Sequence, residues 1–568
     1  MTNSAFKIKN SIAVRRIFLT MLVPTLLMNL TTAIASLADA MIIGKYLDDA
    51  SLSVVTFATP VYMIINTLAA LFTVGGCIVM SIDMGKGDKK AANRAFSQSM
   101  EFLFITGLLL GAAGLFFSEP ITGLLGATPD IWDEVQLYTK IILLGGMIFV
   151  FNIGIAFFVR NDGRPSLSMI GMILGIATDI ALNFLFVGYM NLGVAGAAYS
   201  TVIGQLLGLL INLTHFLNSK NTLKFMFCFD KTIIRILKSG ISTALTFIYQ
   251  FVTVLLLNHF VVSMAGTNGV VVYTVVFNLY TVALSVFEGL SQTVQPMVGV
   301  FYGENSNQKI KQSLKLAILA AVVLCGTVTV ILEIAPEIIS SLFSLSQASI
   351  IRDSSQAVRI YAVSLTIMTV NVILGYYLQT IENTSMSAWL VSLRCCILFL
   401  GSVFALGTLF GLNGVWMSYT VSELLTFGVF LIMTAIKRRK MMMSGIRADR
   451  LLLDTDKEER SATFIYRCTD RKDAEFKEFS DAVKKHMESC YDTEGQLCEN
   501  TMRYLEQLGS ITPNKRRSFI EVDINCADKK VFIRDNFSGK ELNPSNIFSD
   551  GNVFEYGPVL GWNRICIE

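Results

Sequence analysis

The chain has 568 residues, of which 53% are hydrophobic and 16% are charged, and its formal net charge is +3. Soluble proteins carry charge on about a quarter of their residues, so this composition excludes an ordinary soluble enzyme. The apolar excess lies before residue 440, whereas the remainder is charged and ordinary in composition. We therefore expect a membrane domain followed by a smaller soluble tail.

Twelve apolar segments follow one another through the first 440 residues. A helix needs about 20 apolar residues to cross the hydrocarbon, whereas the strands of a barrel would alternate and be about half as long. We therefore predict twelve transmembrane helices, at roughly 17–43, 52–82, 95–117, 136–159, 167–188, 193–216, 236–262, 269–298, 315–338, 357–380, 387–409 and 413–436.

Basic residues cluster in alternate connections between these segments. They occur near the N-terminus, in the second, fourth, sixth and eighth connections and after the last segment, for example at Lys9, Lys86, Arg160, Arg235 and Lys437. Lysine and arginine mark the cytoplasmic side of membrane proteins. We therefore expect a multi-pass protein of the cell membrane whose two termini, and whose tail, are cytoplasmic.

The two halves of the membrane domain repeat each other at a spacing of about 218 residues. Gly85 recurs as Gly303, Asn152 recurs as Asn371, and Gly193-Val194-Ala195-Gly196 recurs as Gly411-Leu412-Asn413-Gly414. Each half has six segments, so the halves enter the membrane in the same orientation and form parallel repeats. We predict an all-α polytopic membrane protein with an N-lobe (1–217), an inter-lobe linker (218–235), a C-lobe (236–440) and a small α/β cytoplasmic tail (455–568).

Four motifs occur in a fixed order through the two lobes: Ala38-Asp39-Ala40-Met41-Ile42-Ile43-Gly44, Ser81-Ile82-Asp83-Met84-Gly85-Lys86-Gly87-Asp88, Asn191-Leu192-Gly193-Val194-Ala195-Gly196-Ala197-Ala198 and Gln295-Pro296-Met297-Val298-Gly299. In order and spacing they resemble the MATE family (multidrug and toxic compound extrusion) of secondary transporters. The resemblance implies a two-lobe fold of twelve helices that exports organic cations or other toxic compounds as protons or sodium ions enter.

Ionisable residues inside the membrane are costly and mark candidate functional sites. Asp179 and Asn183 lie four residues apart in the fifth segment and so share one helix face. Their oxygens could exchange a proton or coordinate a sodium ion; the alternative is a structural hydrogen-bond pair. The resemblance implies that Asp39 faces them as a partner in ion coupling. The family usually has the asparagine before the aspartate, and this chain has the reverse order.

Further polar residues lie in the eighth segment, in the C-lobe, and at two positions that the repeat relates. Glu288 and Gln292 form a polar stripe in the eighth segment, which could contact a cationic substrate, sense protons or hydrogen-bond between the lobes. The repeat-related Asn152 and Asn371 either line the substrate cavity or support the lobes. Arg394 and Glu423 are predicted to form a structural ion pair. Segments 236–262 and 357–380 contain no acid, so we place ion coupling in the N-lobe.

The tail is predicted to contain a strand at 462–466, helices at 472–489 and 493–508, and a hairpin at 520–533. It weakly resembles a histidine-kinase-type ATP-binding domain in its anti-sigma-factor-like form. The resemblance implies that Asn500 holds magnesium and that Asp535 contacts adenine. Two expected residues differ, because Gln496 replaces an acid and Phe537 replaces a glycine. We interpret the tail as a degenerate regulatory or interaction module with a vestigial nucleotide site.

We expect an efflux antiporter and not an enzyme, working as a monomer in the bilayer without cofactors or nucleic acid. Its expected partners are small organic cations and H⁺ or Na⁺. One alternative is a flippase for lipid-linked saccharides, which would need a strongly cationic cavity; Arg394 is the main intramembrane base. Another is a membrane sensor kinase, for which His486 is the available phosphoacceptor in the tail.

Overall fold

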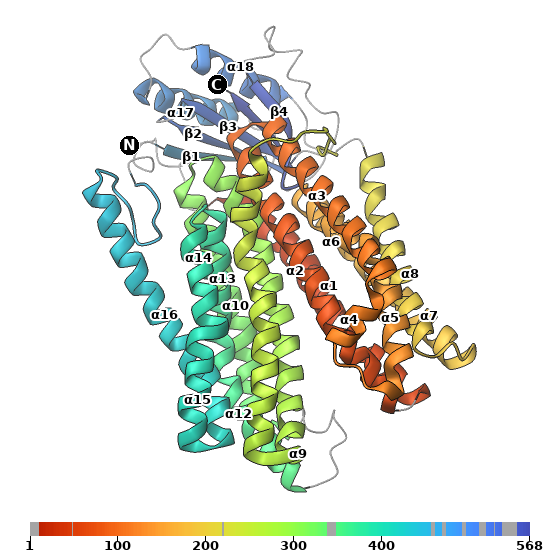
Figure 1. Cartoon of the computed structure of the whole chain (residues 1–568). Coiled ribbons are helices and arrows are strands. Elements are labelled where there is room, and N and C mark those ends of the chain that lie inside the picture. Colours follow the sequence, from red (N-terminus) through yellow and green to blue (C-terminus); the bar gives the residue numbers. More distant parts are fainter. Residues whose placement is uncertain are drawn as a thin grey trace.

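The structure is a computed structural model that describes residues 11–47, 49–218, 221–337, 348–455, 461–468, 473–490, 496–510, 518–526, 529–536 and 554–567. Figure 1 shows two groups of long helices with a small sheet domain at one end. Among these residues, ten helices are long and apolar enough to cross a membrane, or twelve if each of two bent pairs is one span. This agrees with the predicted twelve-helix architecture.

The first lobe is built from helices that pack along one another. Ser11 caps the first of them, because its Oγ accepts a hydrogen bond from the Val14 amide at 3.2 Å. The fourth span bends by 45° at Gly145. The helices are α1 (Ile12–Tyr46), α2 (Asp49–Lys86), α3 (Lys89–Phe116), α4 (Ser118–Leu124), α5 (Trp132–Leu144), α6 (Gly146–Asn161), α7 (Pro165–Asn183) and α8 (Gly193–Leu213), with short turns at Pro129–Ile131, Phe184–Tyr189 and Thr214–Leu217.

The second lobe begins with α9 (Thr232–Gly303), which contains two spans, Thr232–Ala265 and Val271–Gly303. Both ends of α9 contact α2, so the two spans run antiparallel. This agrees with the two separate spans predicted at 236–262 and 269–298. The remaining helices are α10 (Asn307–Ile334), α12 (Ala348–Ala362), α13 (Ser364–Thr380), α14 (Thr384–Ser392), α15 (Leu398–Phe410) and α16 (Leu412–Met443), with a π-helical turn (η4) at Leu393–Ile397.

The two lobes meet along α2 and α9 through glycines that allow the backbones to touch. A Cβ on Gly85 would lie 2.1 Å from the Val300 carbonyl oxygen, and one on Gly303 would lie 2.9 Å from the Gly85 Cα. The repeat-related Gly85 and Gly303 therefore face each other where the lobes cross. In Figure 1 the lobes lie together at the end that carries the sheet and diverge toward the opposite end.

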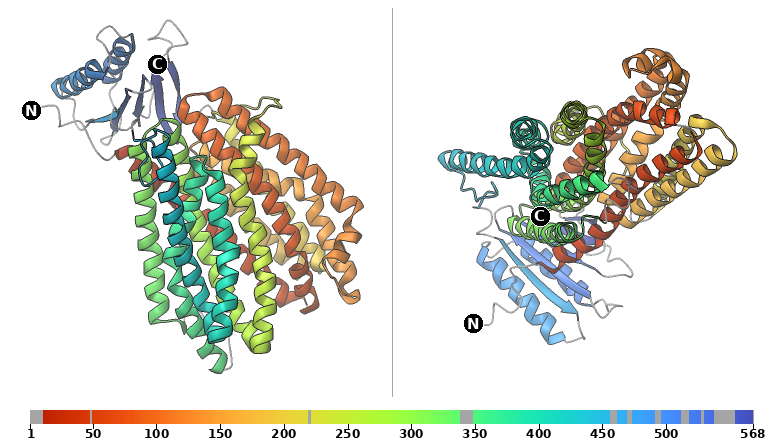
Figure 2. Two further views of the ribbon diagram at one scale, coloured as in Figure 1. Left: turned by 60° about the vertical axis from the view of Figure 1, so that its left-hand side comes forward. Right: turned by 90° about the horizontal axis from the view of Figure 1, so that it is seen from below.

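The tail forms one antiparallel sheet in the order β1-β2-β3-β5-β4. Residues alternate across β2: Ile520, Val522 and Ile524 join the core under the helices, whereas Glu521 and Asp523 point to the opposite face. Figures 1 and 2 show that this opposite face lies against the helix ends of the membrane domain. The elements are β1 (Ser461–Cys468), α17 (Asp473–Cys490), α18 (Gln496–Ser510), β2 (Ser518–Asn525), β3 (Lys530–Asp535), β4 (Phe554–Val559) and β5 (Trp562–Ile567).

Candidate functional site

The N-lobe encloses the predicted acid of the fifth segment. Asp179 and Asn183 lie in the last turns of α7 and are 6% and 0% exposed. The facing residue on α8 is Gly204, where a Cβ would lie 2.8 Å from the Asp179 Cβ. The absence of a side chain at Gly204 lets the α8 backbone approach the acid closely. Asp179 is therefore held between two helices and does not face lipid.

Asn152 belongs to the same polar interior. Its Nδ2 donates a hydrogen bond to Oε1 of Gln205 on α8 at 2.7 Å, and the side chain lies beside Gly208. Gly204 and Gly208 are one turn apart on one face of α8. Asp179 and Asn152 thus lie at successive levels along that face.

Asp39, the third predicted coupling residue, lies near the end of α1. The placement of its side chain lies outside the part of the chain that the structure describes. Helix α1 packs along α7, the helix that carries Asp179. The partnership of Asp39 with Asp179 and Asn183 stays a prediction.

The C-lobe has a buried ion pair at its centre. Arg394 on η4 donates from Nε to Oε1 of Glu423 on α16 at 2.8 Å, which is the ion pair expected from the sequence. Asn371 on α13 donates from Nδ2 to Oε2 of the same carboxylate at 2.7 Å. Glu423 follows Gln205 at the repeat spacing. Asn152–Gln205 and Asn371–Glu423 are therefore equivalent hydrogen bonds in the two lobes, and the C-lobe version has gained a charge pair.

Two cavities flank this ion pair and share Arg394. The larger has an empty volume of ≈ 520 Å³ and reaches Glu423, and the other, of ≈ 480 Å³, is lined by Glu288 and Asn371. The Arg394–Glu423 pair is neutral as a unit, so Glu288 supplies the uncompensated charge among the ionisable lining residues. The rings that line the larger cavity are those of Tyr273, Phe277, Tyr280, Phe399 and Tyr419.

The structure separates the predicted polar stripe of the eighth segment into two roles. Glu288 lines a C-lobe cavity, whereas Gln292 joins the lobes. Oε1 of Gln292 accepts hydrogen bonds from Nη1 of Arg160 on α6 at 2.8 Å and from Nδ2 of Asn29 on α1 at 3.2 Å. For Gln292, the structure thus favours interlobe hydrogen bonding over cavity lining.

Arg160 is a buried polar residue at the end of α6. We expected it in a cytoplasmic connection; it lies in the last turn of α6, next to that connection, where it is 1% exposed and its guanidinium lies 4.2 Å from the centroid of the Phe157 ring. This burial was not predicted. The one feature of the sequence that could have indicated the burial of Arg160 is its position directly after the apolar Phe157-Phe158-Val159.

The vestigial nucleotide site of the tail stays a prediction, because only part of it lies among the residues that the structure describes. Asn500 is buried in α18. Asp535 ends β3, accepts a hydrogen bond from Nδ2 of Asn563 on β5 at 2.8 Å, and lies near Tyr504 of α18. The corner that would complete the site, including Phe537, lies outside the described residues.

Comparisons with known proteins show which families and structures this architecture is similar to. A family model described as MatE matches residues 24–185 and 239–405. The multidrug export protein MepA of Staphylococcus saprophyticus is 23% identical over 436 residues, covering 76% of this chain and 94% of that protein. MepA of Staphylococcus haemolyticus is 25% identical over 406 residues, covering 70% and 88%.

Solved structures show the same fold. A crystal structure of MATE in complex with MaL6 has a TM-score of 0.72 at 22% identity and covers 76% of this chain and 97% of its own. An outward-facing multidrug resistance MATE family transporter of the MOP superfamily has a TM-score of 0.70 at 23% identity, with the same coverage.

Proposed function

The chain belongs to the MatE family of membrane transporters, and from this we propose that it is an antiporter that exports organic cations in exchange for protons or sodium ions. It is a multi-pass membrane protein of the multidrug efflux type and not an enzyme. The observation that carries the choice of cargo is the charge of the C-lobe cavities. The enclosed acid of the N-lobe supports ion coupling there.

The lining of the C-lobe cavities favours an amphipathic cation. With Glu288, the two linings together hold two acids and one base, since Arg394 is the base and is already paired with Glu423. Tyrosine and phenylalanine rings attract cations through their faces. A lipid-linked pyrophosphate would meet the opposite charge balance, so the flippase alternative is disfavoured.

Coupling requires that one ion and one cargo favour different states of the same protein. We place the ion at Asp179 and Asn183, with Asp39 as the expected partner. Binding of a proton or sodium ion at this enclosed carboxylate would stabilise one arrangement of the lobes. Binding of the organic cation in the C-lobe would stabilise the other. The lobes would then rock relative to each other, so that their α2–α9 contact opens in one state and closes in the other, carrying cargo out as the ion enters.

Several properties complete the proposal. Basic residues gather at the sheet end of the helices, including Lys86, Lys309 and Lys437. This supports a cytoplasmic location for that end, for the tail and for both termini. We propose a monomer in the cell membrane, with the tail (455–568) as a regulatory module joined to an N-lobe (1–217) and a C-lobe (236–440) linked by 218–235.

Paired variants test cargo and coupling separately. In vesicles containing the purified protein, we expect Glu288→Gln to weaken binding of a fluorescent organic cation. We expect Asp179→Asn to bind that cation normally but to lose export driven by a proton or sodium gradient. Asp133→Asn, at an exposed acid in the first turn of α5, is the matched control. Gradient-driven export at the wild-type rate by Asp179→Asn would remove this acid from the mechanism.

A further inference from the structure

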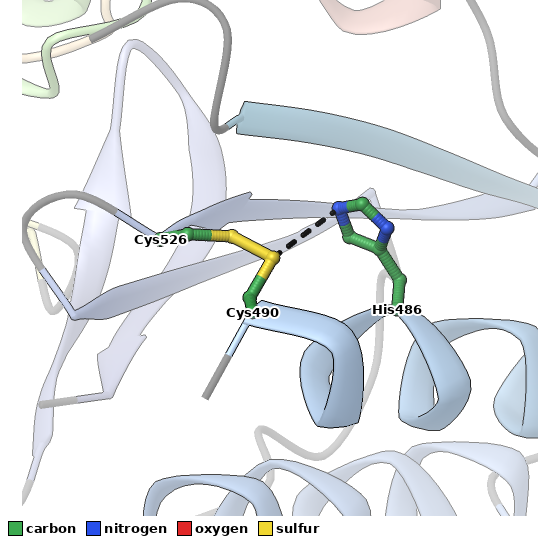
Figure 3. Close-up of side chains that lie close together, drawn as sticks. All are labelled: His486, Cys490 and Cys526. Carbon is green, nitrogen blue, oxygen red and sulfur yellow. Dashed lines mark hydrogen bonds between the residues drawn. A yellow bond between two sulfur atoms is a disulfide. The ribbon is translucent and has the colours of Figure 1, made fainter. Parts of the chain in front are cut away.

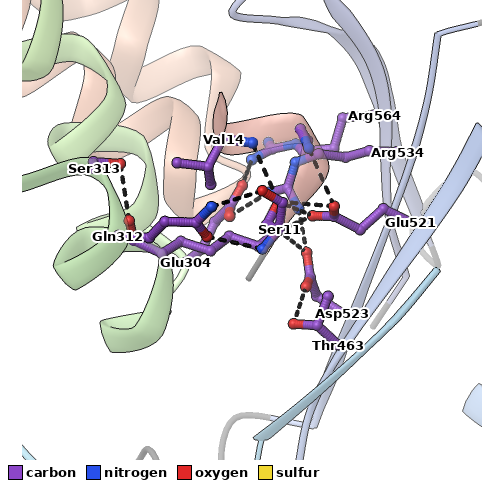
Figure 4. A network of polar contacts seen from close by, with 12 residues as sticks. Ser11, Val14, Glu304, Gln312, Ser313, Thr463, Glu521, Asp523, Arg534 and Arg564 are labelled. Carbon is purple, nitrogen blue, oxygen red and sulfur yellow. Dashed lines mark hydrogen bonds and ion pairs between the residues drawn. The ribbon is translucent and has the colours of Figure 1, made fainter. Parts of the chain in front are cut away.

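The sheet face of the tail that lies against the membrane domain is made of charged residues that are buried. Glu521 and Asp523 on β2, Arg534 on β3 and Arg564 on β5 are each at most 8% exposed. Their partners come from the membrane domain and from one another (Figure 4). Charged side chains on the face of a sheet are usually in contact with water. Here they are buried, so each of them needs a partner of opposite charge to offset the cost of losing its water.

Arg564 contacts both lobes with a single guanidinium. Its Nη2 donates to the Met84 carbonyl oxygen at 2.6 Å, at the end of α2 in the N-lobe. Its Nη1 lies 2.9 Å from Oε1 of Glu304, which follows α9 in the C-lobe. A cation at a helix C-terminus also interacts favourably with the helix dipole. Arg564 thus ties the two lobes together beside Gly85 and Gly303, where they cross.

Glu521 makes a second bridge of the same kind. Its carboxylate accepts a hydrogen bond from Oγ of Ser11, the N-cap of α1 in the N-lobe, at 2.8 Å. It also pairs with Nζ of Lys309, at the start of α10 in the C-lobe, at 2.5 Å. Ser11 is itself bonded across the lobes, since its backbone exchanges two hydrogen bonds with Gln312 at 2.8 Å.

Asp523 and Arg534 connect the two bridges into one network. Asp523 pairs with Lys309 and Arg534, and Arg534 pairs with Glu304. Lys309, Arg534 and Arg564 therefore balance Glu304, Glu521 and Asp523; the C-lobe supplies Lys309 and Glu304, and the tail supplies the other four charges. Removing one member leaves an uncompensated buried charge.

We propose that the tail is a lock that holds the transporter closed on the cytoplasmic side and must undock before the lobes can separate there. This inference rests on the transport function proposed above and adds its regulation. Opening the cytoplasmic side requires α2 and α9 to part at Gly85 and Gly303. Because Arg564 and Glu521 each bind both lobes, the lobes cannot part while the sheet stays docked. A signal that displaces the tail would start transport.

The lock can be tested in the full chain by measuring the distance between the lobes. Spin labels at the exposed Lys90 (α3) and Lys315 (α10), attached through a ketone-bearing amino acid, leave the native cysteines intact. We expect Arg564→Ala and Lys309→Glu to add a longer-distance population, raising its share roughly tenfold, and to speed export severalfold. Arg503→Ala, which removes only the exposed pair with Glu499 on α18, should change neither.

A charge swap protects the test against simple misfolding. Lys309→Glu combined with Glu521→Lys restores one opposite-charge pair but sets a carboxylate against Asp523, so we expect the short distance and slow export to return in part. Identical distance distributions in wild type, Arg564→Ala and Lys309→Glu would overturn the lock. Absence of export from every variant, with the distances shifting as expected, would instead count against the transport function.

A separate observation in the tail points to a metal site. His486 and Cys490 are one turn apart on α17, and Cys526 directly follows β2 (Figure 3). All three are half-buried, and their ligand atoms lie within 4.8 Å of one another. His486 Nε2 is 3.7 Å from the Cys490 Sγ, and the two cysteines are joined by a disulfide.

The proposed cytoplasmic location favours the reduced form of this cysteine pair, because cytosolic thiols are kept reduced. Two thiolates and an imidazole are preferred ligands of zinc, at about 2.3 Å for sulfur and about 2.0 Å for nitrogen. In a tetrahedral site such ligands stand roughly 3.5–3.8 Å apart, which matches the present separation of His486 and Cys490. The sulfurs reach this spacing by side-chain rotation after reduction.

We infer that His486, Cys490 and Cys526 bind a zinc ion in the reduced tail, with water as the fourth ligand. Binding releases the two thiol protons to solvent and involves no change of oxidation state. The ion would join α17 to the end of β2, the strand that carries Glu521 and Asp523. The site therefore stabilises the tail fold independently of the lock.

Metal content of the purified full chain tests this site. After reduction and incubation with Zn²⁺ alone, we expect one ion per chain in the wild type and in Cys498→Ser, a cysteine on α18 outside the cluster. Cys526→Ser and His486→Ala should bind at least roughly tenfold more weakly. Co²⁺ should give a thiolate charge-transfer band in the wild type and in Cys498→Ser, and a much weaker one in Cys526→Ser. Equal metal content in wild type and Cys526→Ser, or a Cys490–Cys526 disulfide that survives reductant, would overturn the assignment.

Discussion

At the residue scale, the glycines at the lobe crossing are the most sensitive positions. A Cβ on Gly303 would lie 2.1 Å from the Ile82 carbonyl oxygen, so alanine there requires the two backbones to move apart. Overpacking of this kind costs about 1–3 kcal/mol. Gly303→Ala should therefore destabilise the state in which the tail side is closed.

This prediction is measured by the distance between labels on the two lobes and by export rate. Gly326→Ala is the control, because a Cβ on Gly326 in α10 meets no atom within 4 Å. An unchanged distance distribution in Gly303→Ala would show that the contact is not maintained during transport.

The Arg394–Glu423 pair supports a second residue-scale prediction. Both side chains are buried and hydrogen-bonded, so removing one partner leaves a buried charge at a cost of about 3–5 kcal/mol. Arg394→Ala should lower the thermal unfolding temperature of the detergent-solubilised protein strongly. Arg394→Leu with Glu423→Leu should lower it less, because no charge is left unpaired. Equal losses in the single and double variants would contradict this reading.

Sequence analysis could predict which polar residues matter better than it could predict their partners. Asp179 and Asn183 were identifiable because ionisable groups in apolar helices are rare. The closeness of Gly204 to Asp179 depends on how α7 packs on α8, which sequence spacing does not encode. The burial of Arg160 was not predicted, because a basic residue at the end of an apolar run is usually an exposed cytoplasmic flank.

At the scale of elements, the hydropathy of the sequence predicted where the membrane-spanning helices lie but not where they bend. The length of an apolar segment indicates whether a helix can cross the bilayer. It contains no information on the bends at Gly145 or between α12 and α13. It did locate the two spans of α9, Thr232–Ala265 and Val271–Gly303. In the tail, β4 was missed because it contains Gly557 and Pro558, which are unfavourable in strands.

The tail sheet supports a prediction on pH. Burial alone would raise the pKa of Asp523, but Lys309 from α10 and Arg534 from β3 outweigh it and hold the pKa below its usual range. Glu521 and Thr463 complete the groups around this network. Undocking removes Lys309 but leaves Arg534 and Thr463 beside Asp523. Because Lys309 lowers the pKa further in the docked state, Asp523 stabilises docking above its undocked pKa, and this contribution is lost as the pH falls through the docked value.

We therefore expect the difference in docking stability between wild type and Asp523→Asn to be constant from neutral pH down to about pH 5. It should shrink below about pH 4. Acid-active protease cleavage between the last transmembrane helix and β1 reports undocking. A difference that disappears already near neutral pH would mean that Asp523 is not held by Lys309 and Arg534.

At the scale of the whole molecule, the two lobes share a framework and differ in charge. Asn152–Gln205 and Asn371–Glu423 are equivalent bonds, but only the C-lobe carries an arginine beside them. The N-lobe instead encloses Asp179. This asymmetry supports a division of labour in which one lobe senses the ion and the other holds the cargo. The repeat was visible in the sequence; the division was not, because it depends on which side chains meet.

We propose that the exit of the organic cation and the entry of a proton or sodium ion are one coupled process. Coupling between two ligands is reciprocal, so it can be measured in reverse. Vesicles that contain the protein are loaded with an organic cation and given no ion gradient, and internal pH and sodium are recorded. We expect the exit of the organic cation to drive protons or sodium ions inward through the wild type and not through Asp179→Asn. Cation exit through the wild type without any movement of either ion would contradict it.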